Sequence, residues 1–139
     1  MIIDTVKRPA DPTALLFAPS GDDLQNLAQA LQNLQIRVVV ANSHEAMTSA
    51  RHTGVVLILV DLDRDPHWKA TLQQLHAAVP AARLLAYSRL SEERLWLDAL
   101  DAGAFDFVCK PFHERELRWI LQSALYARAP RLPGVITGQ

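Results

Sequence analysis

Five short apolar segments alternate along the chain with longer stretches in which apolar residues recur at helical spacing. The central segment, residues 55–60, holds six consecutive apolar residues and ends at Asp61. An unbroken apolar run of this length is typical of a strand buried on both faces, as in a parallel sheet. The other predicted strands are 14–18, 36–40, 83–87 and 105–109.

A predicted helix follows each strand. In the first, Leu24, Leu27, Leu31 and Leu34 form one apolar stripe, and Asp22 and Asp23 lie in its first turn. The later helices are predicted over about 44–53, 68–79, 91–102 and 117–125. Five strand–helix units with short connections predict a parallel five-stranded sheet with helices on both faces.

The length of 139 residues suits one domain, which we place at residues 13–127, with a loose arm at 1–12 and a linker or tail at 128–139. The formal net charge is −1, which gives no reason to expect direct binding of nucleic acid by this chain. The only cysteine, Cys109, excludes an internal disulfide and fits the cytoplasm. No apolar run approaches the roughly 18 residues of a membrane span.

Ligands of open α/β sheets bind beyond the carboxyl ends of the strands, and Asp61 and Ser88 are predicted to lie at that edge. A carboxylate in such a place is a candidate for chemistry. The alternative is that Asp61 caps the turn that follows its strand.

Residues 99–112 read A-L-D-A-G-A-F-D-F-V-C-K-P-F. They resemble the A-L-x-A-G-A-x-D-[YF]-[LIV]-x-K-P-F stretch of response-regulator receiver (CheY-like) domains of two-component signalling. The resemblance extends over about residues 13–126. It implies a flavodoxin-like (βα)5 fold, a doubly wound parallel sheet with strand order 2-1-3-4-5. It also implies a signalling module and not an enzyme.

The resemblance also implies roles for single residues. Asp61 matches the phosphoacceptor, and Ser88 and Lys110 match the groups that contact the phosphoryl oxygens. Phe107 matches the aromatic switch residue, which is expected to turn inward when Ser88 is drawn toward the phosphate. Pro111 resembles the family's cis-proline.

The sequence departs from the family at the acidic pair after strand one, where Ala18 and Pro19 stand. We expect Asp22 and Asp23 to serve the helix dipole instead. Asp61 and Asp63 are then only weak metal candidates, so no cofactor is expected and Mg²⁺ binding should be weak. This pattern indicates an atypical receiver, or pseudo-receiver.

Two further departures lie near the same edge. Arg89 follows Ser88 where the family has a small residue, and its guanidinium either covers Asp61 in place of a metal or points to solvent. Asp63 and Asp65 lie in the polar loop after Asp61, where a carboxylate can approach a cation but where polar residues are commonplace.

Large side chains outside the predicted core suggest a partner surface on the fourth helix, fifth strand and fifth helix, which would serve a homodimer or an output domain. The candidates are Trp96, Leu97, Leu100, Arg118 and Trp119.

Three functions remain open. The favoured one is a regulatory interaction module that controls a transcriptional output without efficient phosphorylation. The second is a working phosphoacceptor, modified on Asp61 by a histidine kinase. The third is an enzyme or small-molecule binder on the same scaffold, because fold does not fix function. Residues 131–139 resemble the entry into the ATPase core of sigma-54-type transcription activators, which would make the chain their N-terminal regulatory part.

Overall fold

The computed structural model describes residues 12–49 and 54–126, and these form a five-stranded, all-parallel sheet. The strand order is β2-β1-β3-β4-β5, which confirms the predicted topology. Each strand begins and ends within one residue of its predicted bounds. The strands are β1 (Thr13–Phe17), β2 (Arg37–Ala41), β3 (Val55–Asp61), β4 (Arg83–Ser88) and β5 (Ala104–Cys109).

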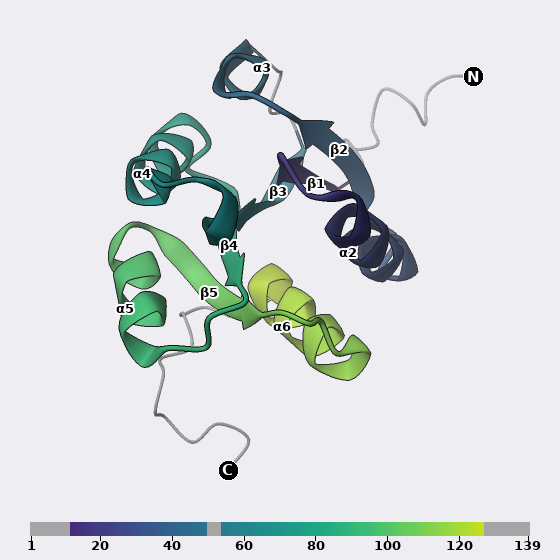
Figure 1. Cartoon of the computed structure of the whole chain (residues 1–139). Coiled ribbons are helices and arrows are strands. Elements are labelled where there is room, and N and C mark those ends of the chain that lie inside the picture. Colours follow the sequence, from purple (N-terminus) through teal and green to yellow (C-terminus); the bar gives the residue numbers. More distant parts are fainter. Residues whose placement is uncertain (1–11, 50–53, 127–139) are drawn as a thin grey trace, which may run out of the picture.

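Helices cover both faces of the sheet. Figure 1 shows α2 and α6 together on one side and α3, α4 and α5 on the other. Their bounds are α2 (Gly21–Asn33), α3 (His44–Ser49), α4 (Trp68–Ala78), α5 (Glu93–Asp101) and α6 (Glu114–Tyr126). The end of the predicted 44–53 helix, the 1–11 part of the arm and the 127–139 tail lie outside the described residues.

The unbroken apolar run of β3 is explained by its two covered faces. Ile58 and Val60 point into the layer beneath α4 and α5, whereas Leu57 and Leu59 point into the layer beneath α2 and α6. Side chains alternate between the faces of a strand, so a strand covered on both sides needs apolar residues at every position. The sheet thereby becomes a rigid support for the residues at its carboxyl edge.

The register of the strands brings the candidate residues to one edge. Asp61 pairs with Tyr87, and Ser88 pairs with Cys109, the residue before Lys110. The segment after Asp61 is not the plain loop that the sequence suggested, because Leu62–Arg64 forms one turn of 3-10 helix, η1. This turn packs against β4, and Asp63 thereby contacts Ser88.

None of the helices in residues 12–49 and 54–126 has the length and apolar character that a membrane crossing requires.

Candidate functional site

Lys110 joins two carboxylates at the carboxyl edge of the sheet. Its Nζ lies 3.0 Å from Asp23 Oδ2 and 3.1 Å from Asp61 Oδ2. The three side chains are almost enclosed, with exposed fractions of 11% for Lys110, 9% for Asp23 and 2% for Asp61. An ammonium between two buried carboxylates satisfies charges that would be costly to bury alone.

These contacts shift ionisation at the site. Burial by itself would lower the pKa of Lys110, but the hydrogen bonds to Asp23 and Asp61 outweigh it and raise that pKa above its ordinary value. The pKa of Tyr87 is raised strongly, first by burial and then by the negative charges of Asp61 and Asp23. Lys110 is therefore held charged and Tyr87 is held neutral.

Asp23 is the site residue that the sequence analysis misjudged. It lies in the first turn of α2, as predicted, and its N–H donates to the capping Ser20 Oγ at 3.2 Å. Its carboxylate, however, is buried and paired with Lys110, so the expectation that it only serves the helix dipole was wrong. The signal was available in the spacing, because Asp23, Leu27 and Leu31 are four residues apart and are the buried positions of α2.

The turn between β1 and α2 places Asp23 at the edge. Ala18 adopts a positive φ of 46°, and its N–H donates to Ala41 O of β2 at 2.8 Å. A left-handed conformation is uncommon for alanine and marks a tightly determined turn. Four residues later the chain is already helical, with Asp22 exposed and Asp23 facing the sheet.

The two oxygens of the Asp61 carboxylate make different contacts, and one of them confirms the predicted cap of the following turn. Its Oδ1 accepts a hydrogen bond from the Asp63 N–H at 2.9 Å and so caps η1. Its Oδ2 faces Lys110. The turn contact therefore orients the same carboxylate that the site uses.

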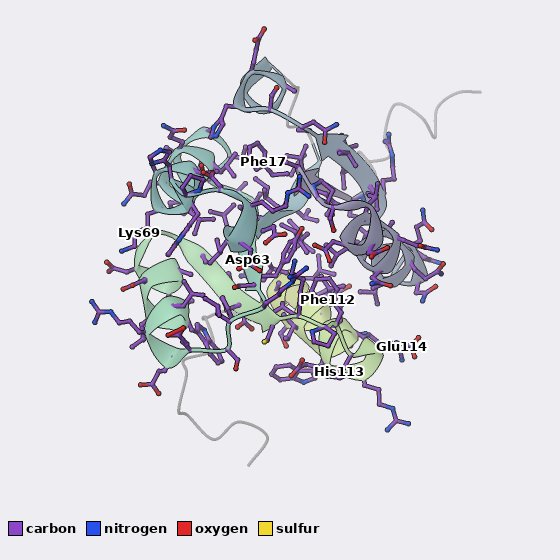
Figure 2. All side chains as sticks on the ribbon, in the orientation of Figure 1. Phe17, Asp63, Lys69, Phe112, His113 and Glu114 are labelled. Carbon is purple, nitrogen blue, oxygen red and sulfur yellow. The ribbon has the colours of Figure 1, made fainter. Side chains whose placement is uncertain are left out.

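Asp63 contacts the other groups of this edge. Its Oδ1 accepts from the Ser88 hydroxyl at 2.5 Å, and its Oδ2 accepts from the Arg89 N–H at 2.8 Å. The same Oδ2 lies 3.9 Å from Lys110 Nζ. Figure 2 shows Asp63 in the middle of this edge, between the two groups of helices. The contact of its carboxylate with Ser88 could not be predicted from the sequence, because it depends on how η1 packs against β4.

Asp65 lies apart from this cluster. Its carboxylate accepts from Thr71 Oγ1 at 2.5 Å and from the His67 N–H at 2.8 Å. Burial would raise the pKa of Asp65, but these hydrogen bonds lower it below its ordinary value. Asp65 therefore anchors the start of α4 and does not face Lys110 among the ion pairs of the described residues.

Phe107 is turned inward and Trp96 packs on it. Phe107 is 4% exposed, and the two rings stack with centroids 6.1 Å apart and planes 21° apart. Trp96 is half-buried against the core, so the expectation that it lies off the core as a surface residue was wrong. A tryptophan whose indole touches Phe107 is placed to report on the position of that ring.

The remaining interface candidates differ in exposure. Leu97 is 42% exposed and Trp119 is 46% exposed. Arg118 is also exposed, and Leu100 is half-buried. Of the five predicted interface residues, Leu97, Arg118 and Trp119 are exposed, whereas Trp96 and Leu100 are half-buried.

Arg89 is exposed and lines a hollow of about 470 Å³ together with Asp22, Asp23 and Lys110. Its contact with the acidic cluster is made by the backbone N–H, which donates to Asp63. Lys110 is the cation paired with Asp61 among the described residues, which does not support a guanidinium cover over Asp61. The Lys110–Pro111 peptide bond is cis, as predicted.

Magnesium is the ion that the receiver resemblance implies, and it requires several oxygen ligands in octahedral geometry. Residues 12–49 and 54–126 contain no group of three or more Asp, Glu, His or Cys side chains placed to hold a metal ion. Asp23 and Asp61 share the Lys110 ammonium, and Asp63 is bound to Ser88 and Arg89. In this arrangement the residues do not fit a resident magnesium ion.

The sequence of this chain is similar to part of one known regulatory protein. The chain matches no family model. A stretch of 59 residues, 42% of this chain, is 41% identical to the response regulator protein PilR of Pseudomonas aeruginosa and spans 13% of that protein. The similarity is therefore to a small part of a much longer relative.

Solved structures extend the likeness over most of the chain. A response regulator from Thermotoga maritima superposes with a TM-score of 0.74 at 22% identity, covering 83% of this chain and 98% of the other. The chemotaxis response regulator CheY4 of Vibrio cholerae gives 0.70 at 19% identity, covering 84% and 100%. A response regulator protein from Burkholderia pseudomallei, solved with a phosphorylated aspartic acid and a calcium ion, gives 0.66 at 20% identity, covering 84% and 68%. At these identities the likeness shows that the chain has the receiver fold.

Proposed function

We propose that this chain is a receiver-type regulatory module of two-component signalling that acts through protein contacts, without efficient magnesium-dependent phosphorylation. The receiver fold and the similarity to PilR support the signalling class. The observation that carries the finer proposal is the Lys110 ammonium bound to both Asp23 and Asp61. A divalent cation would have to compete for carboxylates that are already neutralised and enclosed.

The partner surface in this proposal is the face of α5, β5 and α6. Leu97 and Trp119 expose large apolar side chains there. A homodimer through this face would bury the same residues on both subunits. An output domain would use the same face. The resemblance of residues 131–139 to the sigma-54-type activators favours a transcriptional output. We place the protein in the cytoplasm.

A working phosphoacceptor is the second candidate. It is favoured by the meeting of Asp61, Ser88 and Lys110 at one edge, and by the phosphorylated aspartic acid of the structurally similar Burkholderia pseudomallei protein. In that reaction an Asp61 oxygen would form a bond to phosphorus. The bond from phosphorus to the donor atom, an imidazole nitrogen of a phosphohistidine or the acyl oxygen of acetyl phosphate, would break, and its electron pair would leave with the donor. Lys110 would neutralise charge on the incoming group.

Intact mass spectrometry separates the two candidates. The purified chain is incubated with magnesium and acetyl phosphate, and Asp61→Asn is the control. We expect no mass gain that depends on Asp61. A phosphate-sized gain in the wild type that is absent from Asp61→Asn would replace the first proposal by the second.

Sedimentation velocity tests the partner surface. We expect self-association that weakens in Trp119→Ala and is unchanged in Lys69→Ala, an exposed substitution on α4. A wild-type chain that stays monomeric would restrict this face to a different partner and remove the homodimer from the proposal.

A further inference from the structure

We infer that the Asp63 carboxylate is a built-in anion that takes the place of a phosphoryl group and holds Ser88 and Phe107 in the inward arrangement. This inference deepens the proposed function and rests on the assignment of the chain as a receiver-type module. It accounts for how such a module keeps one regulatory state without phosphorylation.

The first support is the set of donors that converge on Asp63. A hydroxyl from Ser88, a backbone N–H from Arg89 and an ammonium from Lys110 approach its two oxygens at 2.5, 2.8 and 3.9 Å. A phosphoryl group bound at Asp61 would need donors of these kinds, because it carries negative charge on several oxygens. In this chain a carboxylate two residues after Asp61 takes them.

The second support is that Ser88 has no hydrogen left to donate. A serine hydroxyl donates one hydrogen bond, and here it goes to Asp63 Oδ1. The Ser88 Oγ in turn accepts a hydrogen bond from the Leu90 N–H at 3.0 Å, and Ser88 is 0% exposed. The hydroxyl is therefore fixed from both sides toward the acidic edge.

The third support is the position of the aromatic ring. With Ser88 drawn to Asp63, Phe107 of the adjacent strand is inward, 4% exposed and stacked on Trp96. Phe107 on β5 is the register partner of Ala86 on β4, two residues before Ser88. The inward ring and the Ser88 hydroxyl bonded to Asp63 thus occur in the same structure, and Asp63 is the anion that accepts from the hydroxyl.

The test compares Asp63→Ala with Asp65→Asn. Asp65→Asn removes one charge from the same segment, but its side chain faces Thr71 and His67 and not Ser88. Nuclear Overhauser contacts between the Phe107 ring and the Trp96 indole are measured without any phosphoryl donor. We expect wild type and Asp65→Asn to keep them and Asp63→Ala to lose at least half of their intensity.

The inference is overturned if Asp63→Ala keeps these contacts at wild-type intensity, or if Asp65→Asn loses them equally. Asp63→Leu, which likewise offers no acceptor to the Ser88 hydroxyl, is used if the alanine variant does not fold, and it is judged by the same criterion. The readout needs no phosphorylation, so it remains decisive if Asp61 proves to be an efficient phosphoacceptor and the proposed function fails.

Beryllofluoride, a phosphoryl analogue, gives a second readout by ¹⁹F NMR titration. Removal of the like charge beside the incoming anion should strengthen its binding about tenfold in Asp63→Ala relative to Asp65→Asn. Equal affinity for the two variants would show that Asp63 does not occupy the phosphoryl position.

Discussion

The Asp23 carboxylate lies 3.0 Å from the Lys110 ammonium, although 87 residues separate them along the chain. Asp23 opens the helix after β1, and Lys110 follows the last strand. Their contact closes the site across the sheet, because β1 and β5 lie on opposite sides of β3. The same ammonium reaches Asp61 at the end of β3, so one cation holds together the first, third and last strand–helix units.

Removing the cation should therefore destabilise the fold. Lys110→Ala leaves two buried carboxylates without their partner, and we expect the free energy of unfolding in urea to fall by about 3–5 kcal/mol. Lys69→Ala is the matched control, because Lys69 is exposed, and its Nζ lies 3.7 Å from Asp98 Oδ2 and 5.6 Å from the centre of the Trp68 ring. That control should change stability by less than about 1 kcal/mol. Similar losses in both variants would contradict the role given to Lys110.

The same variant should respond to magnesium. Without the ammonium, Asp23 and Asp61 become available as oxygen ligands. We expect saturating Mg²⁺ to restore about 1 kcal/mol or more to Lys110→Ala by binding the folded state, and to leave the wild-type unfolding midpoint unchanged. Stabilisation of the wild type by Mg²⁺ to the same extent would mean that Lys110 does not exclude the metal.

The Tyr87 hydroxyl is buried and has no hydrogen-bond partner among the described residues. Its ring packs edge-on against Phe112, with centroids 5.4 Å apart. Tyr87→Phe keeps this packing and removes the unsatisfied hydroxyl, so we expect the free energy of unfolding to rise by about 1 kcal/mol. Chemical denaturation at pH 7 measures the change. A loss of stability would show that the hydroxyl has a partner, such as a bound water.

Stability should also decline at high pH. The pKa of Tyr87 is raised from 10.0 and that of Lys110 from 10.5, so the folded chain holds both protons more tightly than the unfolded chain does. Their contribution is fully present below about pH 10 and is lost as the pH rises above it. Urea unfolding between pH 8 and 11 should show this fall, and the fall should be smaller in Tyr87→Phe. A free energy of unfolding that does not change over this range would contradict both shifts.

The two tryptophans of the predicted partner surface should behave differently. Trp96→Ala removes the stack on Phe107 and should lower the free energy of unfolding by about 2 kcal/mol. Trp119 is 46% exposed, so Trp119→Ala should change stability by no more than about 0.5 kcal/mol. Denaturation of the two variants side by side measures this contrast. Equal losses would mean that Trp119 also belongs to the core.

Much of the fold could be predicted from local patterns. Apolar and polar residues do not alternate from Val55 to Val60, because both faces of β3 are covered. This property can be recognised in the amino-acid sequence alone. The same logic placed Asp61 and Ser88 at one edge, since parallel strands end on the same side of a sheet. The cis bond before Pro111 followed from the family resemblance.

The candidate site was less predictable, because its contacts join residues from separate elements. Asp23 could have been found from its four-residue spacing to Leu27, but its partner Lys110 is fixed only when β5 is placed in the sheet. Trp96 was assigned to the surface on the helical pattern, and only the packing of α5 against β5 shows that its indole meets Phe107.

By itself, then, the sequence predicted five strand–helix units and the edge of the sheet where Asp61 and Ser88 lie, because hydrophobic period and strand polarity are local properties. The strand order and the place of Lys110 at this edge came from the family resemblance. Only the tertiary structure decided which charges meet. Asp23 reaches Lys110 through the turn at Ala18, and Asp63 reaches Ser88 because η1 packs against β4. Such contacts depend on the direction of side chains over a few ångströms, and the hydrophobic periodicity of a sequence does not encode that direction.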